Sequence, residues 1–201
     1  MELKADLWFP SIVFAGYPET IDMDSLKQIA LAWQAKEPGL GGNSNENGWH
    51  SRSVENVNLV DPNYVYTINA FLKELDNSVE YCRVSMGLPE LVFQNFWINI
   101  NGPGAYHTLH NHQDAMLSGV FYIDVPADNM GDLQFYRGDE AQYYIPDNLD
   151  QYNTITSTMA TYPPKTGMIV IFPSWIKHQV KSNQSDLQRI AVSFNYGVKS
   201  K

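Results

Sequence analysis

The hydrophobic pattern of the chain changes near residue 90, and this change limits the possible folds more than any other feature. From Leu91 onward apolar side chains alternate with others, as in Phe96, Ile98 and Ile100. Alternation of this kind is typical of strands with one buried face. Five further runs, each bounded by Gly, Pro, Asn or Asp, are predicted strands at residues 117–125, 133–136, 154–162, 168–172 and 187–196. Many short antiparallel strands predict a β-sandwich or jelly roll.

Residues 1–90 carry the helical signals of the chain. Apolar residues at helical spacing predict one helix from near Thr20 or Asp22 to just before Pro38, and a second from an N-cap at Asp61 to Gly87. The apolar stretch 7–16 reads as a strand, because it is too short for a bilayer span and contains Pro10. We expect one domain over residues 1–201, in which 1–90 supports the outside of a β-rich core at 91–201.

The net charge and the cysteine content of the chain indicate which binding partners and which cellular compartment to expect. The chain has 13 Lys and Arg against 22 Asp and Glu, which gives a net charge of −9. This charge argues against binding to nucleic acid or to anionic membranes. Hydrophobic residues make up 44% of the chain, which excludes global disorder. Cys82 has no partner for an internal disulfide, which fits a reducing cytosol, so we expect a soluble, intracellular (cytoplasmic) protein. We also expect no membrane span, because no apolar stretch is long enough.

Histidines form the main candidate for a chemical site. His110 and His112 are two residues apart, so in extended backbone both imidazoles point to one face, and Asp114 continues that face. His178 follows a predicted buried strand, and a jelly roll can bring it to the same place. Imidazoles with a carboxylate suit Fe, Mn, Zn or Co. His107 lies three residues before His110, so it is expected on the opposite face, either as a neighbour of the site or as a surface residue.

The last predicted strand adds a candidate anion-binding residue. Arg189 shares one face with Ser193 and Asn195, and Ile190, Val192 and Phe194 occupy the other. If the polar face points into the jelly roll, Arg189 is a buried charge that needs an anionic partner, such as a small carboxylate. If this face meets water, an arginine there needs no partner.

These motifs, in this order, resemble the iron(II)- and 2-oxoglutarate-dependent oxygenases, and most of all a poorly characterised branch from bacteria and marine viruses. The resemblance covers nearly the whole chain. It is carried near the front of the chain by residues 7–10 and 45–51, and later by His110-Asn-His112, Ser118-Gly119, the segment from Gly131 to Phe135, Phe172-Pro-Ser-Trp175, His178 and Arg189.

The resemblance implies a double-stranded β-helix with iron at the mouth of the barrel. It also implies that Arg189, helped by Tyr122, binds the far carboxylate of 2-oxoglutarate, with Ser193 and Asn195 as further cosubstrate-binding residues. The implied activity is hydroxylation of a small-molecule or peptidyl substrate, coupled to decarboxylation of 2-oxoglutarate.

Two ligand sets remain open. His110, His112 and His178 form a three-histidine set, which the nearer branch favours, whereas His112, Asp114 and His178 form the two-histidine, one-carboxylate set of most of the superfamily. We favour the three-histidine set, because Asp114 lies in the expected turn before Leu117. Asp114 then becomes a neighbour of the site or a substrate contact.

Two other functions fit the same residues. One is a cupin-like three-histidine metalloenzyme that does not use 2-oxoglutarate and binds the substrate's own carboxylate through Arg189. The other is a metal-bearing jelly roll that binds small molecules or carbohydrates without catalysis. His50 is expected to serve packing, and residues 137–153 form either a lid or an ordinary loop.

Overall fold

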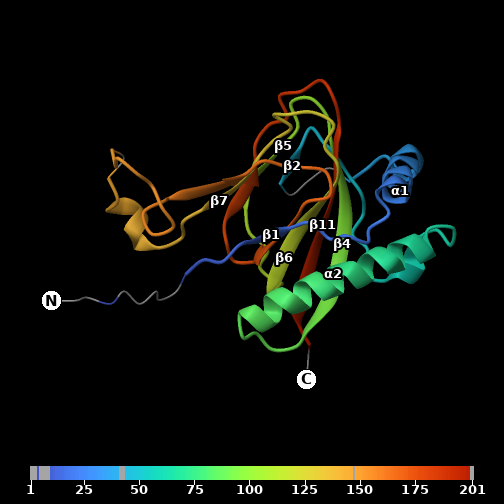
Figure 1. The fold of residues 1–201 in the computed structure, drawn as a ribbon. Helices are drawn as coiled ribbons and strands as arrows, with labels where there is room; N and C mark the ends of the chain where they lie inside the picture. The colour runs from blue at the N-terminus through green and yellow to red at the C-terminus, as the bar shows by residue number, and fades with distance from the viewer. Residues whose placement is uncertain (1–3, 5–9, 41–43, 147, 200–201) are drawn as a thin grey trace.

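In the computed structural model, residues 4, 10–40, 44–146 and 148–199 are described. They form two antiparallel β-sheets packed face to face, and two α-helices cover the outer face of the larger sheet (Figure 1). This arrangement is a double-stranded β-helix, which confirms the fold class predicted from the sequence. Part of the predicted strand 7–16 lies outside the described residues, and residues 14–16 are a strand.

The larger sheet has six strands. In spatial order they are β1 (Phe14–Gly16), β9 (Ile169–Pro173), β6 (Leu117–Asp124), β11 (Arg189–Val198), β4 (Leu91–Asn101) and β3 (Trp49–His50). Strand β11 lies between β4 and β6 and pairs with both along most of its length. Successive side chains of β11 point to opposite faces of this sheet: Val192 packs against the helices, and Ala191 packs between the sheets.

The smaller sheet has five strands. In spatial order they are β2 (Asn45–Glu46), β5 (Tyr106–His110), β10 (His178–Val180), β7 (Leu133–Tyr136) and β8 (Met159–Tyr162). The connection between β7 and β8 includes a 3-10 turn, η2 (Glu140–Tyr143), and projects away from the sheets (Figure 1). Tyr143 and Tyr144 on this arm are exposed.

Helix α1 (Met23–Lys36) begins at the later of the two predicted positions, because the Asp22 side chain accepts a hydrogen bond from Ser25 N at 3.0 Å and caps the helix. Helix α2 (Val65–Ser85) begins later than predicted, and Asp61 is not its N-cap. The Asp61 side chain instead accepts from Asn63 N at 3.1 Å, and the Asp61 carbonyl accepts from Tyr64 N, so these residues form a turn before the helix. A further 3-10 turn, η1 (Val57–Leu59), precedes it.

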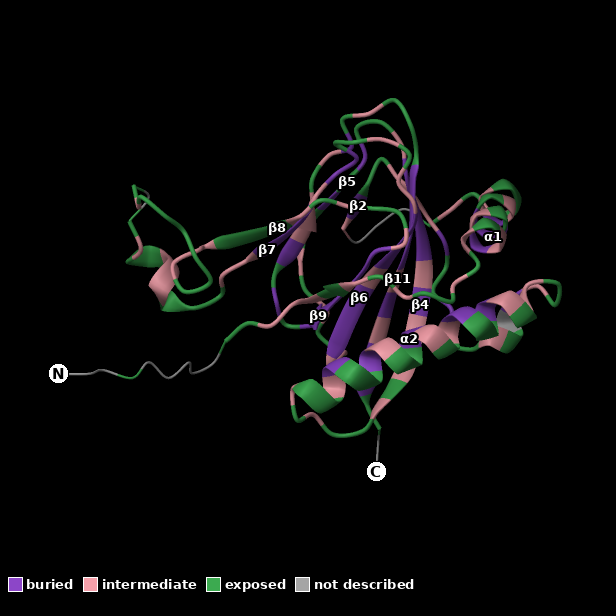
Figure 2. Ribbon diagram, in the orientation of Figure 1, coloured by how far each residue is buried: buried purple, intermediate pink, exposed green. Residues whose placement is uncertain are grey.

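Two apolar cores stabilise the molecule. The larger core lies between the helices and the outer face of the six-stranded sheet, and it includes Leu75 and Cys82 of α2 and Phe194 of β11. The smaller core lies between the sheets and includes Phe135 of β7 and Phe172 of β9. Strands of the larger sheet are therefore buried on both faces (Figure 2), which explains the continuous apolar run of β9.

None of the helices in the described part of the chain combines the length and the apolar character needed to cross a bilayer.

Candidate metal centre

The sheets bring three histidines from distant parts of the chain together. His110 ends β5 and is the direct antiparallel partner of His178 on β10, and His112 follows β5 by two residues. The ring centroids are 4.3 Å apart for His110 and His178, 5.2 Å for His112 and His178, and 5.3 Å for His110 and His112. One ring nitrogen of each lies within 4.8 Å of those of the other two, which is close enough for a single metal ion.

Backbone carbonyls fix two of the three rings. His110 Nδ1 lies 2.7 Å from the Thr108 carbonyl oxygen, and His178 Nδ1 lies 2.9 Å from that of Ile176. A carbonyl oxygen accepts only, so each Nδ1 carries the proton and each Nε2 keeps its lone pair, with Ser44 Oγ 3.4 Å from Nε2 of His110. This is the tautomer that metal-binding histidines adopt when a hydrogen bond orients the ring.

A buried polar network fixes the third ring. His112 Nδ1 lies 2.6 Å from Asn195 Oδ1, and Ser118 Oγ donates to the same amide oxygen at 2.7 Å. Ser118 Oγ also lies 2.8 Å from Ser174 Oγ, and Asn195 Nδ2 donates to Asn95 Oδ1 at 3.0 Å. His112 thus also donates from Nδ1 and presents Nε2.

The environment keeps the three imidazoles neutral. Burial lowers the pKa of His110 and His112, and it lowers the pKa of His178 to about 3, with the neighbouring His110 adding to the shift. A neutral imidazole has the lone pair that a metal ion requires, so the cluster is prepared to bind a cation at neutral pH.

Asp114 lies outside this cluster. It occupies a turn between β5 and β6 and is exposed to solvent. Its backbone carbonyl accepts a hydrogen bond from Gln94 Nε2 at 2.9 Å. The geometry therefore favours the three-histidine set over the set that includes Asp114.

A cavity of about 630 Å³ extends from the three histidines between the sheets. Its lining includes Arg189, Tyr122, Ser193 and Asn195, the four residues expected to bind a cosubstrate. All five histidines of the chain also line it: His50, His107, His110, His112 and His178.

Arg189 is buried in this cavity, with 3% of its surface exposed. Its Nη1 donates to the backbone carbonyls of Met130 at 3.0 Å and Gly131 at 2.6 Å, whereas its Nε has no hydrogen-bond partner among the described residues. Burial lowers the pKa of the guanidinium, which nevertheless stays charged at neutral pH. The charge of Asp132 acts on the guanidinium and partly offsets this shift, but the hydrogen bonds of Arg189 within the described residues go to backbone carbonyls, so Nε is left for an anion.

Tyr122 lies beside Arg189, whose guanidinium carbon is 5.8 Å from the tyrosine ring centre. Its hydroxyl is buried and has no partner in the parts of the chain that the structure describes. Burial raises the pKa of Tyr122 to about 12, so the phenol remains a donor at neutral pH. A carboxylate accepts from both groups, so the pair fits the far carboxylate of 2-oxoglutarate.

Ser193 and Asn195 lie on the same face of β11 but are engaged with protein groups. Ser193 Oγ accepts from Asn99 Nδ2 at 3.0 Å. Asn195 Oδ1 accepts from His112 and Ser118 and its Nδ2 donates to Asn95, so these contacts hold a histidine ring.

The prediction that His107 points away from His110 is wrong. His178 of β10 pairs with His110 of β5, but Val180 pairs with His107. The three-residue interval on β5 therefore lies opposite a two-residue interval on β10. This β-bulge turns the His107 side chain to the same side as His110. His107 is buried and lines the cavity.

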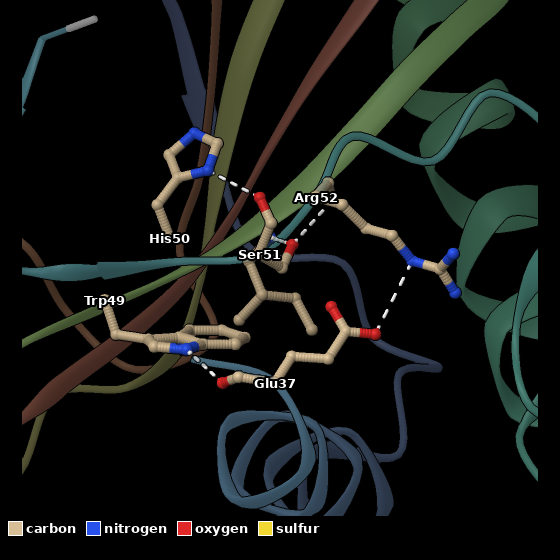
Figure 3. A network of polar contacts seen from close by, with 6 residues as sticks. Glu37, Trp49, His50, Ser51 and Arg52 are labelled. Carbon is tan, nitrogen blue, oxygen red and sulfur yellow. Dashed lines mark hydrogen bonds and ion pairs between the residues drawn. The ribbon is translucent and has the colours of Figure 1, made fainter. Parts of the chain in front are cut away.

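The segment of β3 and the residues after it forms one wall of the cavity. Figure 3 shows how it is fixed: Trp49 Nε1 donates to the Glu37 carbonyl at 3.1 Å, and Arg52 Nε lies 3.6 Å from Glu37 Oε1. His50 Nδ1 lies 2.5 Å from the Ser51 carbonyl, and its ring stacks on Trp97 at 5.8 Å. None of the described residues between 137 and 158 lines the cavity, so the β7–β8 arm does not cover it in this structure.

Comparisons with known proteins agree with this geometry. Residues 95–195 match a family model described as "Putative 2OG-Fe(II) oxygenase". A prolyl-4-hydroxylase from Pseudomonas putida has a similar structure, with a TM-score of 0.62, 13% identity and coverage of 95% of this chain and 94% of that chain. A comparison with curated proteins gives no match.

Two further solved structures are similar. A Trichoplax adhaerens prolyl hydroxylase in complex with a hypoxia inducible factor peptide has a TM-score of 0.67 and 12% identity, covering 92% of this chain and 83% of that one. HygX from Streptomyces hygroscopicus, with nickel and 2-oxoglutarate bound, has a TM-score of 0.61 and 9% identity, covering 94% and 84%. At these identities the likeness shows the fold alone.

Proposed function

The chain belongs to the 2OG-Fe(II) oxygenase family, and from this premise we propose that it is a hydroxylase that acts on a C–H bond of a small-molecule or peptidyl substrate. Enzymes of this family use iron(II) and 2-oxoglutarate. The single observation that carries the proposal is the convergence of three neutral imidazoles at one end of a cavity that also holds a buried arginine.

We propose His110, His112 and His178 as the iron ligands. Each presents an Nε2 lone pair, because each Nδ1 donates to an oxygen of the protein. Imidazole is a suitable donor for iron. These three imidazoles would hold the iron, and the cavity beside them would take the keto acid.

We propose that Arg189 and Tyr122 bind the far carboxylate of 2-oxoglutarate. The support is the fit: a buried guanidinium Nε and a buried hydroxyl, both without a partner in the described chain, lie in the same cavity as the histidines. When bound, iron would supply the oxidising chemistry by which 2-oxoglutarate and dioxygen give succinate and carbon dioxide, with one oxygen atom of dioxygen going to succinate and the other to the substrate. The protein's own groups hold the cosubstrate in one orientation and keep bulk water from it.

We propose that the substrate binds at the wall formed by His50 and Trp97. These rings stack on each other, and Trp97 also lies 5.8 Å from His112, so this wall borders the metal ligands. An aromatic surface next to polar groups such as Ser53 and Asn99 offers both apolar contact and hydrogen bonds.

The test is formation of succinate by protein supplied with iron(II), 2-oxoglutarate, oxygen and a reductant, together with anaerobic binding of 2-oxoglutarate to the iron-loaded protein. We expect both, and we expect Arg189→Gln to weaken 2-oxoglutarate binding by about 10-fold or more. Arg137→Gln is the matched control, because Arg137 pairs with Asp139 on the β7–β8 arm.

Two results would contradict the proposal in different ways. Metal binding without binding of 2-oxoglutarate would favour the cupin-like enzyme or the non-catalytic binder. Succinate formation with a substrate whose product gains no oxygen atom would retain the oxygenase family and exclude hydroxylation.

A further inference from the structure

A third buried polar group accompanies Arg189 and Tyr122 in the cavity. His107 is buried, with 9% of its surface exposed, and it lines the same cavity. Its Nε2 has no hydrogen-bond partner within the described residues. A buried polar atom without a partner is costly, so such an atom in a cavity indicates a ligand or an ordered water that completes its bonding.

The backbone is specifically arranged to turn this side chain inward. The bulge in β5 opposite His178 and Val180 adds one residue between His107 and His110. Without it, alternation would place these two side chains on opposite faces of the sheet. Bulges commonly re-aim side chains next to active sites.

His107 is close enough to Arg189 to be affected by its charge. Burial is the main cause of the lowered pKa of His107, and the Arg189 guanidinium is the next. The imidazole is therefore neutral at neutral pH and carries one proton, which Nε2 or Nδ1 can hold. It does not bring a second cation next to Arg189.

We propose that His107 Nε2–H donates a hydrogen bond to the far carboxylate of 2-oxoglutarate, beside Arg189 and Tyr122; this rests on the proposed function. A carboxylate offers about four acceptor positions, so a guanidinium alone does not satisfy it. A phenol and a neutral imidazole add donors without adding charge to a site that already holds a buried cation. His107 is thus a cosubstrate-binding residue, although its spacing from His110 predicts that it lies on the opposite face.

The experiment measures dissociation constants by calorimetry on anaerobic, iron(II)-loaded protein. The ligands are 2-oxoglutarate and 2-oxopentanoate, which has the same carbon chain and keto acid but no far carboxylate. The variants are His107→Gln, whose amide nitrogen reaches the position of Nε2, and His107→Asn, whose amide does not. Both variants stay polar, and measured iron stoichiometry shows whether the metal site is intact.

We expect His107→Asn to weaken binding of 2-oxoglutarate about 10-fold, the effect of losing a hydrogen bond to a charged group. His107→Gln should retain most of the affinity, and neither variant should change the affinity for 2-oxopentanoate.

Equal effects of His107→Asn on both ligands, or no effect on 2-oxoglutarate, would overturn the role of His107 and leave the proposed function standing. Failure of the unaltered protein to bind 2-oxoglutarate would overturn both. Loss of iron from both variants would also overturn the proposal, because it would assign His107 to the metal site.

Discussion

At the scale of single residues, the orientation of the imidazoles matters as much as their identity. The sequence alone identifies His110, His112 and His178 as candidates, and the structure brings them together. The partners of their Nδ1 atoms could not be predicted, because two are backbone carbonyls and the third is Asn195, 83 residues away from His112. The resemblance implies a cosubstrate-binding role for Asn195, whereas its contacts in the structure favour a role in positioning the His112 ring.

This positioning gives a first prediction. Asn195→Ala removes the acceptor of His112 Nδ1 and leaves the ring free to turn, so iron(II) affinity should fall about 10- to 100-fold. Equilibrium dialysis with metal analysis measures the loss. Ser193→Ala is the control, because Ser193 Oγ bonds to Asn99 and not to a histidine. Unchanged affinity in Asn195→Ala would show that the ring is fixed by other contacts.

Histidine burial gives a second prediction, on pH dependence. All five histidines have a pKa lowered by burial, and that of His178 falls to about 3. Below about pH 6.5 the unfolded chain therefore binds more protons than the folded chain, so the free energy of unfolding falls as the pH falls from about 6.5 toward 4. Carboxylate pairs lose their contribution at lower pH.

Urea unfolding of metal-free protein at about pH 7 and about pH 5 measures this effect, because these values lie on either side of the ordinary histidine pKa. Metal-free His178→Gln should show a smaller difference between the two pH values than the unaltered protein, because its buried group does not titrate. Equal stability at both pH values in the unaltered protein would contradict the burial of neutral histidines.

At the scale of elements, the sequence predicts the long strands better than the short ones. Strands β4, β6, β7, β9 and β11 follow from alternation or from apolar runs. Strands β5 and β10, which carry His110 and His178, do not follow from such a pattern. Strand β5 has five residues and β10 has three, and most of their side chains are polar or face the cavity. Neither strand therefore has a hydrophobic pattern that could be recognised in the sequence. The bulge that turns His107 inward likewise depends on pairing with β10.

A glycine before β7 gives a third prediction. Gly131 has φ of +93°, and a Cβ there would clash with the Lys181 carbonyl oxygen and lie 3.2 Å from Arg189 Nη1. Gly131→Ala should therefore lower the free energy of unfolding and also weaken binding of 2-oxoglutarate, because it displaces the carbonyls that hold Arg189.

Gly104→Ala is the matched control for the backbone. Gly104 has φ of +77°, but a Cβ added there would have no other atom within 4 Å, so this variant shows the left-handed penalty alone, about 1–2 kcal/mol. Chemical denaturation and calorimetry compare the two. Equal stability loss and unchanged 2-oxoglutarate affinity in Gly131→Ala would contradict the role of this turn.

At the scale of the whole molecule, the helices support the sheet whose inner face carries Arg189. Leu75 of α2 is fully buried against that sheet, so Leu75→Ala should cost about 2–5 kcal/mol of stability. Tyr66→Ala on the same helix is the control, because Tyr66 is 87% exposed. Urea unfolding measures both, and equal losses would show that α2 does not stabilise the sheet as described.

The overall fold was predictable in outline because the pattern changes at residue 90, after which the chain is almost entirely strands. The short strands β1, β2 and β3, which precede residue 90 and also pair into the two sheets, were not separated from the helical part in this way. That the two parts form one domain over residues 1–201 stays a prediction. The cavity was less predictable, because its lining comes from eight strands: β3, β4, β5, β6, β7, β9, β10 and β11. No local sequence pattern shows which polar side chains of these strands face the same cavity.

We propose that His110, His112 and His178, without Asp114, bind one iron ion. The most direct test is the iron(II) stoichiometry and affinity of four variants, His110→Ala, His112→Ala, His178→Ala and Asp114→Ala, measured anaerobically by equilibrium dialysis. We predict one iron per chain in the unaltered protein and in Asp114→Ala, and a loss of affinity in each histidine variant. Loss of iron in Asp114→Ala together with unchanged iron binding in His110→Ala would contradict the three-histidine ligand set.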